Sequence, residues 1–256
     1  MTRIMFLLTV IVIVVVSIYS TVLAHEKGYE YTAMRTRVVP KIDADLNDIV
    51  WKKAPSATLE LINSGGKVGK EYVSTAWACY DDEFIYVAFL NGEPNPKKIT
   101  TTIKAHDGGT WNDDENELFI EPNNVGAKPY FHIMINAANV TEDAENGGKE
   151  NAWEPKSLDS ATKIRDKDWI LELKISFEDL NIKGGAPVGK SWGWNFNRHI
   201  MSGVDIWTGW SETGASFHTP NRFGDLIFSD EELAVSPNDK MTTTWGSIKS
   251  IYWSVF

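Results

Sequence analysis

Short stretches in which apolar and polar residues alternate recur along most of the chain. Residues 73–80 and 84–90 both alternate, and the polar run 81–83 between them is typical of a turn, so this region predicts a β-hairpin. Stretches of the same kind predict further strands at residues 38–43, 56–62, 117–121, 130–136, 160–165, 169–176, 192–200 and 222–228. Apart from one short helix ending at Lys53, no stretch has a helical period. The pattern therefore predicts an all-β fold, an antiparallel β-sandwich of the jelly-roll or immunoglobulin-like type.

The alternation also predicts which side chains face the core. In residues 117–121, Leu118 and Ile120 lie on one face, opposite Glu117, Phe119 and Glu121. In residues 130–136, the face expected to be core carries Phe131, Ile133 and Ile135, and the other face carries Tyr130, His132, Met134 and Asn136. Each of these strands therefore has one apolar face and one mixed face.

The chain divides into four parts. Residues 1–24 contain Arg3 and a long apolar run that ends in Val22-Leu23-Ala24, which is typical of a secretory signal peptide and its cleavage site. The apolar part, residues 4–24, is also long enough to remain as a membrane tether. We expect residues 25–37 to be a loose lead-in, residues 38–230 a single β-sandwich domain, and residues 231–256 a linker and tail. Both interpretations of the N-terminus predict export, to an extracellular, periplasmic or cell-surface location.

Composition narrows the range of partners. The net charge of -10 and the scattered lysines argue against a nucleic acid, which would require a basic stripe. The only cysteine, Cys79, excludes an intrachain disulfide and is expected to be a buried thiol. The 11 tryptophans are an unusually high number, so some of them are expected to line a recognition surface.

The acidic stretch at residues 110–122, TWNDDENELFIEP, combines residue types that are typical of a binding site. Trp111 stands near its start, carboxylate and amide residues follow, and Glu117 lies on the strand six positions after Trp111. An indole and a carboxylate at this spacing can share one edge of the sheet. A sugar needs that combination, because its C–H faces are apolar and its hydroxyls donate hydrogen bonds. The alternative is a solvated acidic loop before a core strand.

A series of short motifs runs through residues 42–228. The series comprises Ile42-Asp43-Ala44 with Asp48 and Trp51, Tyr80-Asp81-Asp82 with residues 85–89, Trp111-Asn112-Asp113-Asp114 with Glu117, then Trp169, Glu172, Ile175 and Phe177, then Trp192, Trp194, Asn195, Phe196 and Arg198, and finally His218, Pro220, Arg222, Phe223 and Gly224. In order and spacing, the series resembles carbohydrate-binding module family 9. Its members are β-sandwich domains of exported glycan-degrading proteins, in one superfamily with haem-binding DOMON-like domains.

The resemblance implies a non-catalytic protein that binds the end of a glycan and takes part in carbohydrate catabolism. In that family two tryptophans enclose the sugar, and one of them precedes a binding glutamate by six residues, a pattern that carries over to Trp111 and Glu117. Residues 214–221, where the second tryptophan would lie, contain none. The residues expected to replace it are Trp207, Trp210, Phe217 and His218.

Other polar residues are candidates for the same groove. Asn136 and His132 could line it. Arg198 could hydrogen-bond a sugar ring oxygen through its planar guanidinium, or pair with a buried carboxylate such as Glu172. We expect the partner to be an oligosaccharide or polysaccharide, bound by a monomer.

Loop carboxylates favour a bound cation. Asp107, Asp113 and Asp114 offer oxygen ligands of the kind that Ca²⁺ takes, and the resemblance implies a structural calcium.

Two alternatives to sugar binding follow from the same residues. The DOMON-like relatives imply a haem or redox site, for which the available ligands are His132, Met134, His199 and Met201. The other alternative is hydrolysis of O-glycosyl bonds, which needs one carboxylic acid of raised pKa beside an ionised partner. A wet acidic loop does not supply the apolar surroundings for that acid.

Overall fold

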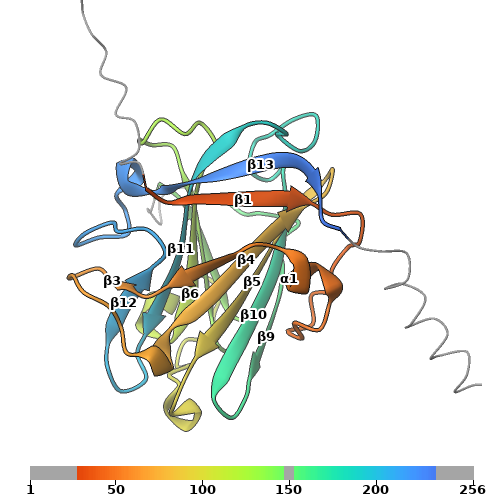
Figure 1. The fold of residues 1–256 in the computed structure, drawn as a ribbon. Helices are drawn as coiled ribbons and strands as arrows, with labels where there is room; N and C mark the ends of the chain where they lie inside the picture. The colour runs from red at the N-terminus through yellow and green to blue at the C-terminus, as the bar shows by residue number, and fades with distance from the viewer. Residues whose placement is uncertain (1–27, 147–152, 235–256) are drawn as a thin grey trace, which may run out of the picture.

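A computed structural model describes residues 28–146 and 153–234 (Figure 1). Within these residues, 13 β-strands form one hydrogen-bonded sheet. The strands are β1 (Glu30–Arg35), β2 (Ser56–Leu59), β3 (Leu61–Ile62), β4 (Ser74–Tyr80), β5 (Phe84–Gly92), β6 (Glu115–Glu121), β7 (Phe131–Asn136), β8 (Thr141–Glu145), β9 (Asp159–Ile164), β10 (Asp168–Ser176), β11 (Ser191–Ile200), β12 (Ile206–Gly209) and β13 (Gly224–Glu232). The helical elements are α1 (Ile49–Lys53) and the 3₁₀ turns η1 (Lys70–Tyr72), η2 (Pro96–Lys98), η3 (Thr110–Asn112) and η4 (Pro220–Arg222).

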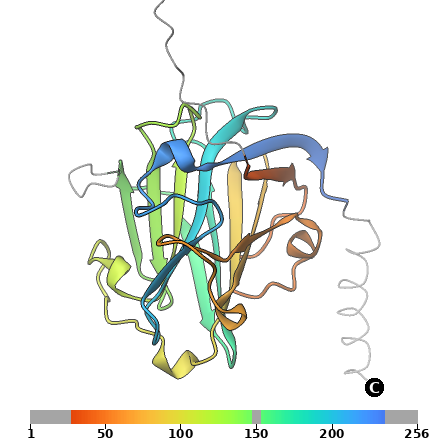
Figure 2. The same ribbon diagram turned by 60° about the vertical axis from the view of Figure 1, so that its left-hand side comes forward.

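The sheet curls into a sandwich, which confirms the predicted class. Its main order is β8-β7-β6-β11-β13-β1-β4-β5-β10-β9, while β12 and β3 extend from β11, and β2 pairs with β4. The halves around β11 and β5 face each other (Figures 1 and 2), and their side chains meet in one core, where the rings of Phe89 and Phe196 lie 5.8 Å apart. Most neighbouring strands are antiparallel, but β1 runs parallel to both β13 and β4, which the antiparallel prediction did not include.

Strand β1 lies within residues 25–37, so the expectation of a loose lead-in there is wrong. The short sequence EYTAMR alternates, and Tyr31 and Ala33 are buried in the core. The Tyr31 hydroxyl lies 2.7 Å from the backbone nitrogen of Ala78 and 2.5 Å from the carbonyl oxygen of Pro55. Residues 38–43, predicted as a strand, form none, and Pro40 at their centre has no N–H to donate to a ladder.

The predicted faces of the two central strands are confirmed. Leu118 and Ile120 lie in the main core, as do Phe131, Ile133 and Ile135. Phe119, on the opposite face, lies in a second apolar cluster with Tyr130, Phe217 and Phe223. The loop that follows β12 thus covers part of the outer face of the sheet.

Arg198 near the end of β11 is fully buried and joins the two halves of the sandwich. Its guanidinium donates to the carbonyl oxygens of Tyr72 at 3.0 Å and Gly92 at 2.8 Å, and lies 3.4 Å from the Glu93 carboxylate. Arg198 therefore pairs with a buried carboxylate, as expected, but the partner is Glu93 and not Glu172. Glu172 accepts hydrogen bonds from the Trp51 indole and from the backbone that precedes α1.

Two other expectations concern the cysteine and a membrane-spanning segment. Cys79 is buried, as predicted, and burial raises the pKa of its thiol. Among the described residues, no helix is long and apolar enough to cross a membrane. The segments at 1–24 and 235–256 lie outside the described residues.

We predict that Arg198→Met lowers the free energy of unfolding by about 3–5 kcal/mol, because it leaves Glu93 buried without its cation and two carbonyl oxygens without their donor. Urea denaturation monitored by tryptophan fluorescence measures the change. The matched control is Arg37→Met, since Arg37 pairs with Glu232 at the exposed surface. Equal destabilisation by the two substitutions would contradict this account of Arg198.

Candidate functional site

A pocket of about 840 Å³ opens on the outer face of β6, β7 and β8. Its floor is formed by alternate residues of these strands, which include Glu117, His132, Met134 and Glu142. One wall comes from residues 205–207 and 215–218, and another from the loop that carries Trp111. The outer face is thus polar where the pocket is open and apolar where the loop after β12 packs on Phe119.

Trp111 stands on η3 and is 36% exposed. The turn is held from below by Glu142 of β8, whose carboxylate oxygen accepts hydrogen bonds from the backbone N–H groups of Gly109 and Thr110, both at 2.8 Å. Gly109 has a φ of 93°, a left-handed conformation that favours glycine. The indole therefore projects from a backbone that a buried carboxylate fixes.

The role of Glu142 could not be predicted, because the polar composition of residues 137–151 is typical of a loop. The segment TEDAE reads as a solvated acidic run, but Glu142 and Ala144 face the pocket side of β8 and are buried. The segment has no alternation of apolar and polar residues that would predict this strand.

A second tryptophan, Trp207 of β12, lies flat on the ring of His199. The ring centroids are 3.6 Å apart and the planes differ by 7°. The Nδ1 of His199 donates to the carbonyl oxygen of Trp111 at 2.8 Å, and Nε2 lies 3.0 Å from the carboxylate of Asp205. His199 thus connects the two pocket tryptophans, one through its backbone and the other through its ring.

The polar floor centres on a hydrogen-bonded pair, His132 and Glu117. The Nε2 of His132 lies 2.5 Å from a carboxylate oxygen of Glu117, and the His132 ring stacks on Phe119 with centroids 4.0 Å apart. His218 stands edge-on to His132 and lies 2.9 Å from the hydroxyl of Tyr130. Burial, and then the neighbouring His132, lower the pKa of His218.

Glu115 lies one pleat away from Glu117 on the same face of β6, but it is fully buried and does not line the pocket. Burial, and then the Glu117 carboxylate, raise the pKa of Glu115 well above its ordinary value. Of the two carboxyls, Glu117 is the one that can meet a ligand.

The structure brings together five of the eight predicted sugar-binding residues. Those that line the pocket are Trp111, Glu117, Trp207, Phe217 and His218. The other three lie elsewhere. Trp210 faces the main core beside Phe196, and Arg198 holds the sandwich together.

Asn136 is the third of these, and it is fully buried. Its side-chain amide donates to a carboxylate oxygen of Asp113 at 2.8 Å. Strand alternation gave the correct face for Asn136, but it does not predict that the loop at residues 100–103 covers the end of β7.

Two of the three expected calcium ligands are used inside the fold. Asp113 accepts hydrogen bonds from the backbone of Thr102 and Ile103 and from Asn136, and Asp114 accepts them from the backbone of Thr100, Met201 and Ser202. Both carboxylates are therefore buried and accept hydrogen bonds from backbone N–H groups, so the prediction that they are loop ligands open to a cation is wrong. Asp107 lies at the pocket, with a carboxylate oxygen 3.6 Å from the His106 ring.

Three of the four expected haem ligands can be placed from their contacts, namely His132, Met134 and His199. His132 and Met134 lie two residues apart on the same face of β7, so they approach the pocket from one side. Both ring nitrogens of His199 have protein partners.

Glu115→Gln should change how stability depends on pH. Folded Glu115 keeps its proton above its ordinary pKa of 4.5, so the folded state binds more protons than the unfolded state, and the free energy of unfolding falls as pH rises through the folded pKa. Glutamine cannot ionise, so we expect the variant to lose less stability than the wild type between about pH 4 and about pH 8. Urea denaturation at both pH values tests this, with exposed Glu178→Gln as the control. A pH dependence unchanged by Glu115→Gln would rule out the buried proton.

Solved structures with a similar fold include carbohydrate-binding modules. A family 9 carbohydrate-binding module from Caldicellulosiruptor kristjanssonii, in complex with cellotriose, aligns with a TM-score of 0.60 and 16% identity over 81% of this chain and 98% of its own. A family 9 module from the same organism in complex with glucose gives a TM-score of 0.60 and 16% identity over 81% of this chain and 100% of its own. A proposed carbohydrate-binding protein from Bacteroides uniformis ATCC 8492 gives a TM-score of 0.60 and 15% identity over 79% and 100%. At such identities the likeness establishes the fold alone.

Sequence comparison supplies the family. Comparison with curated proteins gives no significant match. The family described as carbohydrate family 9 binding domain-like matches residues 42–231, which is well over half of the chain and extends from before α1 into β13. The match includes the loop of Trp111, the strand of Glu117 and the aromatic segment around Trp207. The chain therefore belongs to the carbohydrate family 9 binding domain-like family.

Proposed function

We propose that this protein is exported and binds the end of a glucose-containing oligosaccharide in the pocket on β6, β7 and β8, without cleaving it. The observation that carries the proposal is the position of Trp111. Its partly exposed indole stands on the wall of a pocket whose floor holds the hydrogen-bonded Glu117–His132 pair. The role in carbohydrate catabolism is to bring such a glycan to the proteins that degrade it.

The chemistry of the pocket suits a pyranose. The C–H face of the ring packs on an indole, and Trp111 and Trp207 each offer one at the pocket surface. Hydroxyl groups need acceptors and donors at the floor, which the Glu117 carboxylate and the His218 ring supply. Because His132 holds Glu117 and His199 holds both tryptophans, little side-chain freedom is lost when the sugar binds.

The family and the solved relatives support the choice of ligand. The C. kristjanssonii modules are in complex with cellotriose and glucose, so glucose-containing oligosaccharides are the first class to test here. The apolar run at residues 4–24 supports export.

Binding without hydrolysis is supported by the placement of the two neighbouring carboxyls. Glycoside hydrolysis needs a protonated acid and an ionised carboxylate on the two sides of the scissile bond. Glu115 has the raised pKa of such an acid, but it is fully buried, and among the described residues it is Glu117 that reaches the pocket from this strand.

Trp111→Ala should weaken cellotriose binding at least tenfold, a loss of about 1.4 kcal/mol, because the stacked face of the sugar returns to water. Isothermal titration calorimetry measures the change. Ile164→Ala, an exposed apolar residue on β9 that does not line the pocket, is the control and should bind as the wild type does. If Trp111→Ala binds cellotriose with unchanged affinity, the pocket is not the sugar site.

Trp207→Ala should also weaken cellotriose binding, by at least about fivefold, or about 1 kcal/mol. The reason is that Trp207 presents a second indole, whereas Phe217 beneath it is 5% exposed and packs on Phe119. Phe217→Leu should therefore change the affinity little in the same titration. The reverse ranking of the two variants would assign the second aromatic surface to Phe217.

A further inference from the structure

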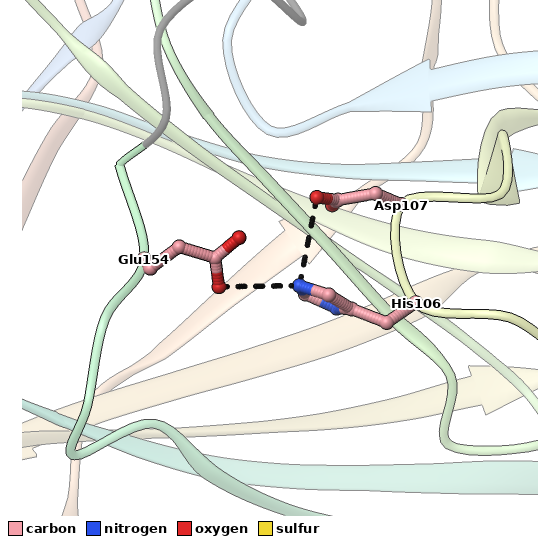
Figure 3. Close-up of side chains that lie close together, drawn as sticks. All are labelled: His106, Asp107 and Glu154. Carbon is pink, nitrogen blue, oxygen red and sulfur yellow. Dashed lines mark hydrogen bonds and ion pairs between the residues drawn. The ribbon is translucent and has the colours of Figure 1, made fainter.

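We infer that His106, Asp107 and Glu154, together with Asp143, form a binding site for a first-row transition dication such as Zn²⁺ at the edge of the pocket. The three exposed residues come from two segments far apart in the sequence and converge in space (Figure 3). One ligand atom from each of His106, Asp107 and Glu154 lies within 4.8 Å of the others. None of these positions is explained by sugar stacking.

The imidazole of His106 is oriented as a metal ligand would be. Its Nδ1 lies 3.0 Å from the carbonyl oxygen and 2.9 Å from the hydroxyl oxygen of Thr141, so this nitrogen is held by the backbone and side chain of β8. The ring is thereby fixed with Nε2 toward the carboxylates, as in the His–carbonyl pairs that orient metal ligands. A dication would replace the proton that Nε2 otherwise shares with them.

Three carboxylates surround this one nitrogen. The Nε2 atom lies 3.3 Å from Glu154, 3.6 Å from Asp107 and 3.6 Å from Asp143. Two ligand atoms on a tetrahedral zinc, with bonds of about 2.0–2.2 Å, are about 3.4 Å apart. The three distances from Nε2 are close to that separation, and the ligand atoms of His106, Asp107 and Glu154 lie within 4.8 Å of one another, so those three side chains would draw together around an ion.

The charge is unbalanced without a cation. Among the ion pairs of residues 28–146 and 153–234, the only partner of these three carboxylates is His106. Within the described residues, one imidazole is thus the only basic partner of three carboxyl groups, an arrangement that favours a bound dication.

Asp143 supplies an independent observation. Its side chain is 2% exposed, one carboxylate oxygen faces His106, and the other has no hydrogen-bond partner. A buried carboxylate oxygen without a donor is costly unless a cation or water satisfies it. The other three side chains are 44–61% exposed, so an ion can enter from solvent.

The donor set selects the class of metal. One imidazole nitrogen with carboxylate oxygens suits Zn²⁺ and its first-row neighbours, whereas Ca²⁺ takes six to eight oxygen ligands. The ion would tie the loop of Asp107 to the edge strand β8 and to the segment of Glu154, three elements that border the pocket.

The test uses the full chain without a histidine tag, stripped with EDTA and titrated separately with ZnCl₂ and CaCl₂ by calorimetry. We expect one Zn²⁺ per chain, and at least tenfold weaker binding for both His106→Gln and Glu154→Gln. Asp159→Asn, an exposed carboxylate paired with Lys174, is the matched control and should bind Zn²⁺ as the wild type does. Circular dichroism checks that each variant is folded.

Cobalt provides a second readout that a purely structural role would not affect. Co²⁺ bound at a site of nitrogen and oxygen ligands absorbs visible light, and this band should be lost in both ligand variants and kept in Asp159→Asn. The inference is overturned if the wild type binds no Zn²⁺, if it binds Ca²⁺ alone, or if both ligand variants bind Zn²⁺ as tightly as the wild type.

Discussion

The buried guanidinium of Arg198 is the contact on which both the fold and the pocket depend. It ties the end of β11 to η1 and to the end of β5. If the two halves of the sandwich separated there, the buried Glu93 carboxylate would lose its cation. The next residue, His199, points to the opposite face of the strand and holds the backbone of Trp111 and the ring of Trp207. Two adjacent residues of one strand therefore fix the interior and the walls of the pocket.

Local alternation was sufficient to predict much of the sheet. It placed Leu118 and Ile120 in the core and located the hairpin of β4 and β5, because side chains on successive strand residues must face opposite sides. It missed β8, whose buried acids have the composition of a surface loop, and β1, whose parallel partners lie far away in the sequence. Alternation gives the face of a residue but not its partner, which is why a buried carboxylate was expected for Arg198 but Glu93 was not identified as that carboxylate.

The candidate site was predicted in part for the same reason. Trp111 and Glu117 share a loop and a strand, so their spacing alone brought them to one pocket. Trp207 and Trp210 belong to one aromatic segment, yet the first faces the pocket and the second the core, and composition cannot separate them. Asp113 and Asp114 were expected to be loop ligands of a cation. Their carboxylate oxygens instead accept hydrogen bonds from the backbone of the loop at residues 100–103 and of the turn after β11. Such tertiary partners are not visible in a single sequence.

The place of β1 between β13 and β4 has a consequence for how the chain folds. The first strand described finds one of its two neighbours only in the last, across nearly the full length of the domain. Closing so long a loop is slow, and until β13 joins, the edges of β11 and β1 lack this partner and are open to pairing with other chains. A polypeptide made from its N-terminus therefore cannot join these two edges until β13 has been synthesised, and the open edges favour aggregation until then.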